Sequence, residues 1–194
     1  MKRALFVILL LAVTTPLPRE VRDVLQRSLI RERETVARYE LFARKADEEG
    51  FRGAAALFRA QAQAERTHAQ RFATLLREYD VPIPAEQELT PEAGSTRENL
   101  ATAAAAERAE RDGDYRDAVE ACKLHGRDDI AKVFDQTRDT EVEHANLCNA
   151  AARNLDSMKE PKTFYVCGKC GYTTDVNLPF CPACQHKAAP KAVE

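Results

Sequence analysis

The sequence contains no tryptophan, only seven glycines and 7% aromatic residues. Proteins built mainly from β-sheet rely on glycine turns and aromatic strand residues, so this shortage favours helices. The sequence also lacks a surplus of positive charge, because 29 Lys and Arg residues face 31 Asp and Glu residues and leave a net charge of -2. Nucleic-acid-binding proteins usually carry a strong basic surplus, so no nucleic-acid partner is expected.

The apolar run at residues 4–13 is too short to span a membrane, since a spanning helix needs about 20 residues. Lys2 and Arg3 precede it, and a charged stretch followed by an apolar one is typical of a secretory signal peptide. We therefore predict a signal-peptide-like segment at residues 1–16, export to the periplasm and no stable membrane span. Residues 12–14 form a poor cleavage site, which leaves a mis-assigned start or an apolar tail on a cytoplasmic protein as alternatives.

Four long helical patterns follow, and local signals mark their ends. The first covers about residues 19–49 and the second about 52–79, and Gly50 between them is a natural C-terminal glycine. The third follows a capping box at residues 95–98 and continues to about Leu124. The fourth covers about residues 128–154. The proline-bearing connection between the second and third is long for antiparallel neighbours, so we expect it to cross the bundle.

An internal repeat supports this organisation. An offset of 76 residues aligns Gly50 with Gly126, Phe58 with Phe134, Glu65 with Glu141, His68 with His144 and Ala69 with Ala145. Five identities without a gap indicate two duplicated helical hairpins, which together make a four-helix bundle over residues 19–156. Pro161 marks a linker, and a cysteine-rich module fills residues 163–190.

The inward-facing stripe of each predicted helix is apolar at its ends and acidic in its middle. In the second helix the stripe is Ala54, Phe58, Gln61, Glu65, His68, Phe72 and Leu75. The acidic residues at matching depth in the four helices are Glu32, Glu65, Glu107, Glu110 and Glu141. Burying even one unpaired charge costs several kcal/mol, so these carboxylates must either be protonated or bind cations.

Two Glu-x-x-His motifs, at Glu65 to His68 and at Glu141 to His144, each put a carboxylate and an imidazole on one helix face. This is the ligand pattern of carboxylate-bridged di-iron bundles. A single such motif is usually a surface pair, but two copies at the repeat offset predict a two-metal site. Glu34 is expected to face solvent instead. Two tyrosines, Tyr39 and Tyr115, are predicted either to hydrogen-bond ligand carboxylates or to be core residues.

Four of the six cysteines form two Cys-x-x-Cys pairs, Cys167 with Cys170 and Cys181 with Cys184. Two such pairs predict a tetrahedral thiolate site, and their spacing alone does not distinguish zinc from iron. The other two cysteines, Cys122 and Cys148, stand alone in helical sequence and receive no predicted role. The remaining histidines, His125 and His186, are predicted to lie at the surface.

With these features the sequence resembles the rubrerythrins over about residues 19–190. The segments that carry the resemblance are Glu32–Tyr39, Phe42–Phe51, Phe58–His68, Glu107–Glu110 and Glu141–His144, followed by the four cysteines. The resemblance implies a mainly α, ferritin-like four-helix bundle with a small C-terminal rubredoxin-like domain. The sequence departs from the family in its N-terminal extension of about 16 residues and in its compact cysteine module.

The resemblance also implies a role for each candidate ligand. Glu65 and Glu141 would bridge two irons, and Glu107 and His144 would be terminal ligands of one of them. Glu32 would be a terminal ligand of the other iron, with Glu110 and His68 as its redox-dependent alternatives. The pattern Cys-x-x-Cys-Gly-Tyr followed by Cys-Pro-x-Cys is similar to rubredoxin and favours one iron, rather than zinc, on Cys167, Cys170, Cys181 and Cys184.

The function implied by the resemblance is a di-iron peroxidase in oxidative-stress defence. It would reduce hydrogen peroxide to water with electrons relayed through the cysteine-bound iron. The sequence has no nicotinamide or flavin fingerprint, so an external reductase is expected as electron donor. A homodimer is also implied. The alternatives are a ferroxidase that handles iron, as ferritin-like bundles do, and a structural zinc-bearing helical protein.

Overall fold

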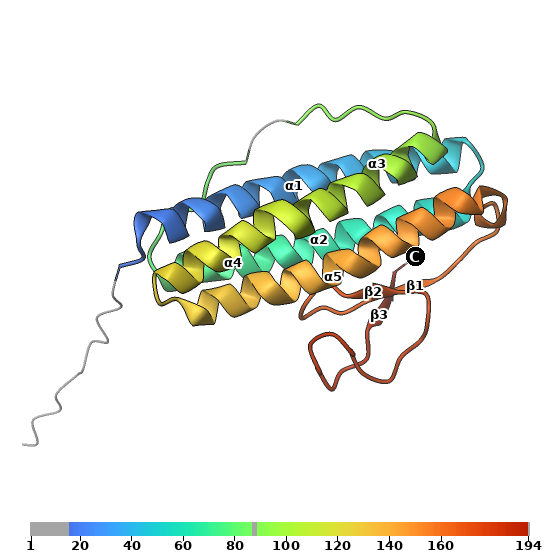
Figure 1. Cartoon of the computed structure of the whole chain (residues 1–194). Coiled ribbons are helices and arrows are strands. Elements are labelled where there is room, and N and C mark those ends of the chain that lie inside the picture. Colours follow the sequence, from blue (N-terminus) through green and yellow to red (C-terminus); the bar gives the residue numbers. More distant parts are fainter. Residues whose placement is uncertain (1–15, 87–88, 194) are drawn as a thin grey trace, which may run out of the picture.

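The computed structural model describes residues 16–86 and 89–193, so the predicted signal-peptide-like segment at residues 1–16 lies outside the described residues except for Pro16. Five α-helices form an elongated bundle with a small sheet on one side (Figure 1). The helices are α1 (Arg19–Glu48), α2 (Arg52–Glu78), α3 (Thr96–Ala109), α4 (Tyr115–Leu124) and α5 (Asp128–Arg153). In the described residues no helix is long and apolar enough to cross a membrane.

The predicted helix ends are confirmed. Gly50 and Gly126 follow α1 and α4 with φ angles of 81° and 67°, a conformation that costs glycine little and other residues more. At the start of α3 the Ser95 side chain accepts a hydrogen bond from the backbone of Glu98, and the Glu98 carboxylate accepts one from the backbone of Ser95. This reciprocal capping box satisfies two backbone donors that the first helical turn leaves free.

The third predicted helix is interrupted, so the expectation of one regular α-helix up to Leu124 is wrong. A π-helical segment, η1 (Glu110–Asp114), separates α3 from α4. Residues five apart, such as Glu110 and Tyr115, point in different directions on an α-helix but share a face across one π turn. Both side chains are buried here, and η1 thereby turns both of them toward the centre of the bundle.

The described parts of the connection between α2 and α3 run along the outside of α1, as predicted for a crossing connection (Figure 1). Two side chains of α1 hold it in place. Gln26 donates to the carbonyl oxygen of Pro82, and Arg33 donates to that of Pro84, both at 2.8 Å. The connection therefore returns the chain to the end of the bundle where α2 began, and α2 and α3 run in the same direction.

The core of the bundle consists of two apolar clusters with an acidic region between them. One cluster surrounds Phe42 and Phe58, and the other surrounds Phe72 and Phe134. The predicted inward stripe of α2 is buried except at its end, where Leu76 is buried and Leu75 only half-buried. The prediction for Leu75 is thus wrong by one residue, because 3.6 residues per turn shift a strict 3,4 pattern over a long helix.

The cysteine module follows a short 3₁₀ helix at Leu155–Met158 and forms a small antiparallel sheet. Its strands are β1 (Phe164–Val166), β2 (Thr173–Thr174) and β3 (Lys191–Val193), in the order β2-β1-β3. β3 lies beyond residue 190, the predicted end of the module. The buried Phe164 and Val166 belong to the same apolar cluster as Phe42, so the module is packed on the bundle.

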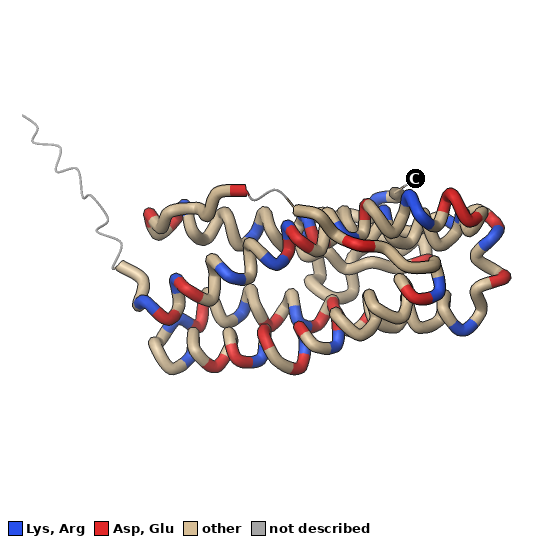
Figure 2. Tube along the Cα trace, turned by 90° about the horizontal axis from the view of Figure 1, so that it is seen from above, with Lys and Arg blue, Asp and Glu red and all other residues tan. Residues whose placement is uncertain are grey.

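Charged residues of both signs alternate along the bundle (Figure 2). Several form surface ion pairs between neighbouring helices, such as Arg59 with Asp47 at 2.8 Å. Exposed pairs of this kind each contribute about 0–1 kcal/mol. The stability of the fold therefore depends mainly on the apolar clusters and on the protons or cations that neutralise the buried acids.

Candidate metal centre

Two groups of buried side chains meet between the apolar clusters, and within each group the potential ligand atoms lie within 4.8 Å of one another. We call them group one (Glu32, Glu65, His68 and Glu141) and group two (Glu65, Glu107, Glu141 and His144). The first hairpin (α1 and α2) gives three members of group one, and the second hairpin (α3 to α5) gives the fourth. Group two takes one member from the first hairpin and three from the second. Glu65 and Glu141 belong to both groups.

Several atoms in these groups are buried without a hydrogen-bond partner in the described residues. They are Glu32 Oε2, Glu65 Oε1, both carboxylate oxygens of Glu141 and His144 Nδ1. His144 Nδ1 lies 2.7 Å from Glu141 Oε2 and 3.2 Å from Glu65 Oε1, but these atoms do not have hydrogen-bonding geometry. Oxygen and imidazole atoms that converge in this way suit divalent metal ions, so the residues fit two of them.

The orientation of His68 is fixed from outside the groups. Its Nε2 lies 2.9 Å from the carbonyl oxygen of Cys170 and 3.1 Å from Thr140 Oγ1. The Thr140 hydroxyl donates its own hydrogen to the carbonyl of Thr137 at 2.6 Å. Both neighbours of Nε2 are therefore acceptors, Nε2 carries a hydrogen, and Nδ1 is directed at the carboxylates, 2.8 Å from Glu65 Oε2.

His144 is held in the same way by the next residue of the cysteine module. Its Nε2 lies 3.1 Å from the carbonyl oxygen of Gly171 and 3.2 Å from Thr173 Oγ1. Gly171 has a φ of 82°, and a Cβ atom there would lie 2.2 Å from His68 Nε2. Two successive backbone carbonyls thus orient both imidazoles, and only glycine fits so close to them.

Both predicted tyrosines hydrogen-bond carboxylates of the groups. The Tyr39 hydroxyl donates to Glu107, and the Tyr115 hydroxyl donates to Glu32. Both tyrosines are also fully buried among the aromatic residues of the core. Each therefore fixes one carboxylate that the other hairpin supplies.

The buried acids cannot all ionise without cations. Burial, together with the neighbouring carboxylates, raises the pKa of Glu32 and of Glu107 well above the usual value. The same causes raise the pKa of Glu110 to about 8. Burial disfavours the charged form of His68, but Glu141 and Glu65 outweigh it and raise the pKa of His68 to about 9. The site therefore takes up positive charge readily, as protons or as metal ions.

Glu110, predicted as an alternative ligand to His68, belongs to neither group, whereas His68 belongs to group one. It is buried at the start of η1, and the charge of Arg31 favours its ionised form. The structure thus brings together six of the seven predicted bundle ligands and leaves Glu110 beside them.

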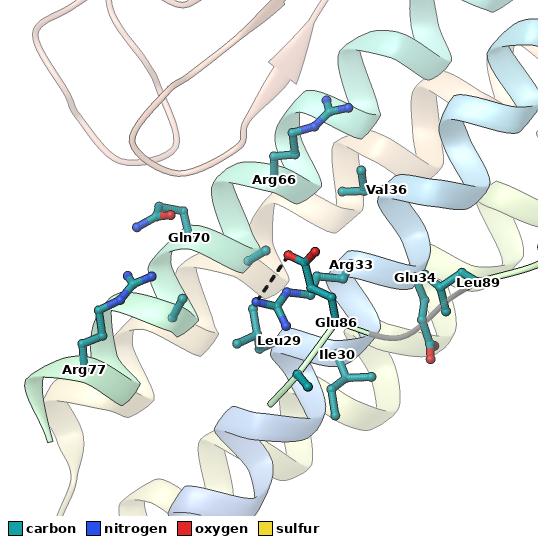
Figure 3. A pocket seen from close by; sticks show the side chains of 13 residues that line it. Leu29, Ile30, Arg33, Glu34, Val36, Arg66, Gln70, Arg77, Glu86 and Leu89 are labelled. Carbon is teal, nitrogen blue, oxygen red and sulfur yellow. Dashed lines mark ion pairs between the residues drawn. The ribbon is translucent and has the colours of Figure 1, made fainter. Parts of the chain in front are cut away.

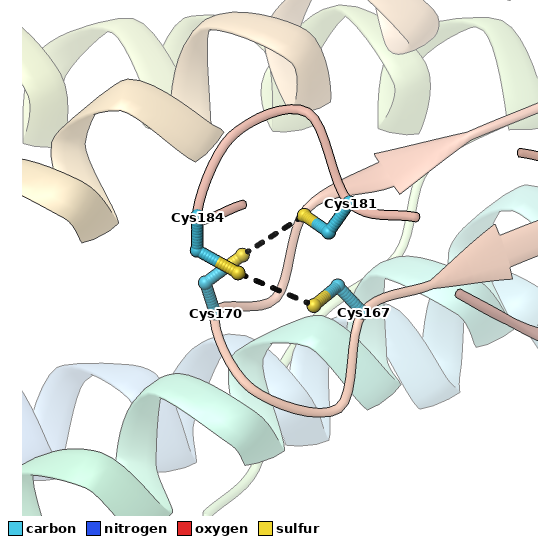
Figure 4. Close-up of side chains that lie close together, drawn as sticks. All are labelled: Cys167, Cys170, Cys181 and Cys184. Atoms are coloured by element: carbon cyan, nitrogen blue, oxygen red, sulfur yellow. Dashed lines mark hydrogen bonds between the residues drawn. The ribbon is translucent and has the colours of Figure 1, made fainter. Parts of the chain in front are cut away.

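The four predicted cysteines converge in the module (Figure 4). The Sγ atoms of Cys167 and Cys184 lie 3.8 Å apart, and those of Cys170 and Cys181 lie 3.6 Å apart. A tetrahedral site with metal–sulfur bonds of about 2.3 Å requires sulfur atoms about 3.8 Å apart, so the cysteines fit a metal ion. All six cysteines are free of disulfides.

Some contacts of the site were not predicted from the sequence. The Cys148 thiol donates to Gln61 Oε1 at 3.0 Å, and Gln61 Nε2 donates to the carbonyl of His144 at 2.9 Å. The predicted inward stripe of α2 included Gln61, but no sequence signal indicated its link to Cys148. Of the cysteines and histidines without a predicted metal role, Cys122 lies in the apolar cluster around Phe72, and His125 lies 3.5 Å from Glu20.

A pocket of about 560 Å³ lies on the outer face of α1 and α2, under the crossing connection (Figure 3). Arg33, Arg66 and Arg77 line it, and Arg33 lies 4.0 Å from Glu86. None of its lining residues belongs to group one or group two. The pocket is therefore separate from the metal centre.

Comparison with known proteins decides the family. The family model described as Rubrerythrin matches residues 23–152. The chain belongs to the rubrerythrin family. A rubrerythrin of Porphyromonas gingivalis is 33% identical over 163 residues, which cover 79% of each chain. Rubrerythrins are di-iron oxidative-stress proteins and generally oxidoreductases, with a further iron on four cysteines. The two acidic groups and the four cysteines are the counterparts of these sites.

Solved structures agree with this assignment. Nigerythrin in its fully reduced, all-ferrous state matches with a TM-score of 0.82 and 26% identity, over 91% of this chain and 88% of that one. A bacterioferritin of Mycobacterium tuberculosis matches with a TM-score of 0.67 and 20% identity, over 75% of this chain and 92% of that one. The bundle is therefore ferritin-like, and the similarity to rubrerythrin-type proteins extends into the cysteine module.

Proposed function

We propose that the protein reduces hydrogen peroxide to water, with electrons that a separate reductase delivers through the four-cysteine site. One observation supports this most directly: the backbone of the cysteine module hydrogen-bonds both histidines of the acidic groups. A module that served only to stabilise the fold would not need to orient these two imidazoles. As a link for electrons, it connects the two metal sites through direct hydrogen bonds.

The route consists of bonds within Cys170 and one hydrogen bond. From the Cys170 thiol the chain leads to the carbonyl oxygen of the same residue, which lies 2.9 Å from His68 Nε2. A second route ends at the carbonyl of Gly171, 3.1 Å from His144 Nε2. Both imidazoles turn Nδ1 toward the carboxylates. Each group is thus connected to the module through its own histidine.

When bound, the irons supply the two electrons that reduction of one peroxide molecule to two water molecules requires. Glu32, Glu65, Glu107, Glu141, His68 and His144 would hold the pair of irons, and the four cysteines would hold the third. Tyr39 and Tyr115 keep Glu107 and Glu32 in place through their hydroxyl groups. The site is almost completely buried, so the chain excludes bulk water from the metal ligands.

The rival function is iron oxidation for storage, and the bacterioferritin-like bundle is compatible with it. Storage needs no external electron donor, so the contact between the cysteine module and both histidines would then have no use. A structural zinc protein is a third candidate, but it would not need two buried Glu-x-x-His motifs at symmetric positions.

The test compares peroxide consumption with and without the relay. Chemically reduced, iron-loaded protein should consume at least one peroxide per iron pair, and a reductase should sustain turnover. Cys170→Ser should abolish reductase-driven turnover, but its chemically reduced iron pair should still consume one peroxide, whereas Cys122→Ser, outside both sites, should match the unsubstituted protein in both measurements. Unchanged turnover in Cys170→Ser would contradict the electron relay, and a colourless, zinc-containing protein would contradict the proposed function.

Two further proposals concern the protein in the cell. We propose a homodimer, as the family resemblance implies, and light scattering on the purified protein tests it. We also propose export to the periplasm, since residues 1–16 have the order of a signal peptide. Cell fractionation with mass analysis of the mature N-terminus tests that proposal.

A further inference from the structure

Arg71 lies on α2 three residues after His68, at the junction with the cysteine module. Its guanidinium is tied to α5 by two hydrogen bonds. Nη1 donates to Thr137 Oγ1 at 3.2 Å, and Nη2 donates to Gln136 Oε1 at 2.7 Å. Both acceptors are neutral, so the hydrogen bonds fix the position of the positive charge without cancelling it.

No carboxylate in the described residues comes within ion-pair distance of Arg71. Two other arginines of α2 differ in this respect, since Arg59 pairs with Asp47 and Arg66 pairs with Glu40. A partly buried arginine without a carboxylate partner is unfavourable unless another negative group lies near.

Arg71 spans the groove between α2 and α5, and the cysteine module docks in the same groove, where Cys170 and Gly171 contact His68 on α2 and His144 on α5. Burial lowers the pKa of Arg71, and the thiolates of Cys170, Cys184 and Cys167, in that order, act in the opposite direction. These cysteines carry negative charge when they hold a metal ion, because a thiol must lose its proton to bind one. The four-cysteine site therefore has a fixed positive charge on its bundle side.

We infer that Arg71 tunes the four-cysteine iron by favouring its reduced state. Four thiolates with Fe(III) carry a net charge of -1, and one added electron gives Fe(II) and a net charge of -2, with no bond made or broken. A fixed positive charge stabilises the more negative state, so it raises the reduction potential of the iron. The inference requires iron on the cysteines but does not depend on peroxide as the substrate.

The experiment measures the midpoint potential of the cysteine-bound iron by spectroelectrochemical titration of the iron-loaded protein. In Arg71→Gln the ratio of reduced to oxidised iron at a given potential should fall about tenfold, which is a shift of about 59 mV for one electron. Arg71→Lys keeps the charge and should retain most of the wild-type potential. Arg77→Gln, an exposed arginine later on α2, should leave the potential unchanged.

Each outcome decides the inference. A wild-type potential in Arg71→Gln would overturn it, and so would an equal fall in Arg71→Gln and Arg71→Lys, because the effect would then come from packing. If Arg71→Gln does not fold, Gln136→Ala provides the second test, since it removes one tether and leaves the charge. We expect a smaller fall there, and an unchanged potential would contradict a role for the fixed guanidinium.

Discussion

The Nε2 atom of His68 lies 2.9 Å from the carbonyl oxygen of Cys170, a residue 102 positions later in the sequence. This hydrogen bond joins a potential ligand of the bundle to a potential ligand of the cysteine site. The next residue, Gly171, forms the matching contact with His144. The two sites of one chain are therefore in direct contact through the protein.

The substitution Gly171→Ala should break the contact between the acidic groups and the cysteine site. The new Cβ would lie 2.2 Å from His68 Nε2, and the φ of 82° would strain any side chain. We expect a loss of about 1–3 kcal/mol of stability from backbone strain alone. Reductase-driven turnover should also slow at least tenfold while both metal sites still fill. Gly168→Ala, where a Cβ meets nothing within 4 Å, is the matched control, and equal turnover in the two variants would contradict the prediction.

Glu65→Ala should cost more metal than Glu34→Ala. Glu65 belongs to both acidic groups, whereas Glu34 is half-buried and lines the outer pocket. Since both residues are helical glutamates, their helix propensities do not separate the variants. Iron analysis should show the bundle pair largely lost in Glu65→Ala and complete in Glu34→Ala. Equal iron contents would mean that the helices are assigned in the wrong register.

Protein freed of metal should melt at a lower temperature at pH 8 than at pH 6. Glu110 has a pKa raised from 4.5 to about 8, and His68 has one raised from 6.5 to about 9. Because both pKa values are raised on folding, their stabilising contribution is complete below the unfolded values and is lost as the pH rises through 8 and 9. Each pKa unit corresponds to about 1.4 kcal/mol, and each kcal/mol to roughly 2–4 °C.

Differential scanning calorimetry at several pH values measures this effect. The lowered pKa values of Glu65 and Glu141 act in the opposite direction only below about pH 4.5, so they do not affect the interval from pH 6 to 8. Iron-loaded protein is the control and should melt at a more constant temperature. A flat melting temperature in the metal-free protein would argue against the inward placement of these acids.

Tyr39→Phe should destabilise the protein by removing the donor to Glu107. Hydrogen bonds to charged groups contribute about 1.5–3 kcal/mol, and the partner left behind is buried. We expect a melting temperature several degrees lower and a changed visible spectrum of the iron pair. Tyr165→Phe on β1, outside both acidic groups, should change neither, and a smaller effect at Tyr39 than at Tyr165 would count against its contact with Glu107.

The acidic groups were predictable because helical periodicity and the 76-residue repeat constrain the same positions. Few glutamates lie on an inward stripe and also stand at the same depth in the bundle as Glu65 and Glu141. The sequence did not decide whether Tyr39 and Tyr115 hydrogen-bond the carboxylates, because a buried tyrosine is also an ordinary core residue. The structure assigns Tyr39 to Glu107, on another helix, and not to Glu32 on its own helix.

Three features could not be predicted from the sequence, and each has a physical reason. The π turn at Glu110 adds one residue to a helix whose composition is ordinary, so periodicity does not reveal it. The contacts of Thr140 and Thr173 with the histidines depend on how the module docks, and docking is set by long-range packing. The spacing of Gly171 after Cys170 is typical of a cysteine knuckle, and nothing local indicates that His68 lies against it.

Each acidic group takes three residues from one helical hairpin and the fourth from the other. Neither hairpin alone can complete a group, so a metal ion gains its full set of ligands only after the two hairpins have docked. Metal retention therefore reports on chain assembly. A molecule whose second hairpin is unfolded or displaced is expected to hold its metal weakly and to lose it to a competing chelator. Metal content then separates fully folded molecules from incompletely folded ones.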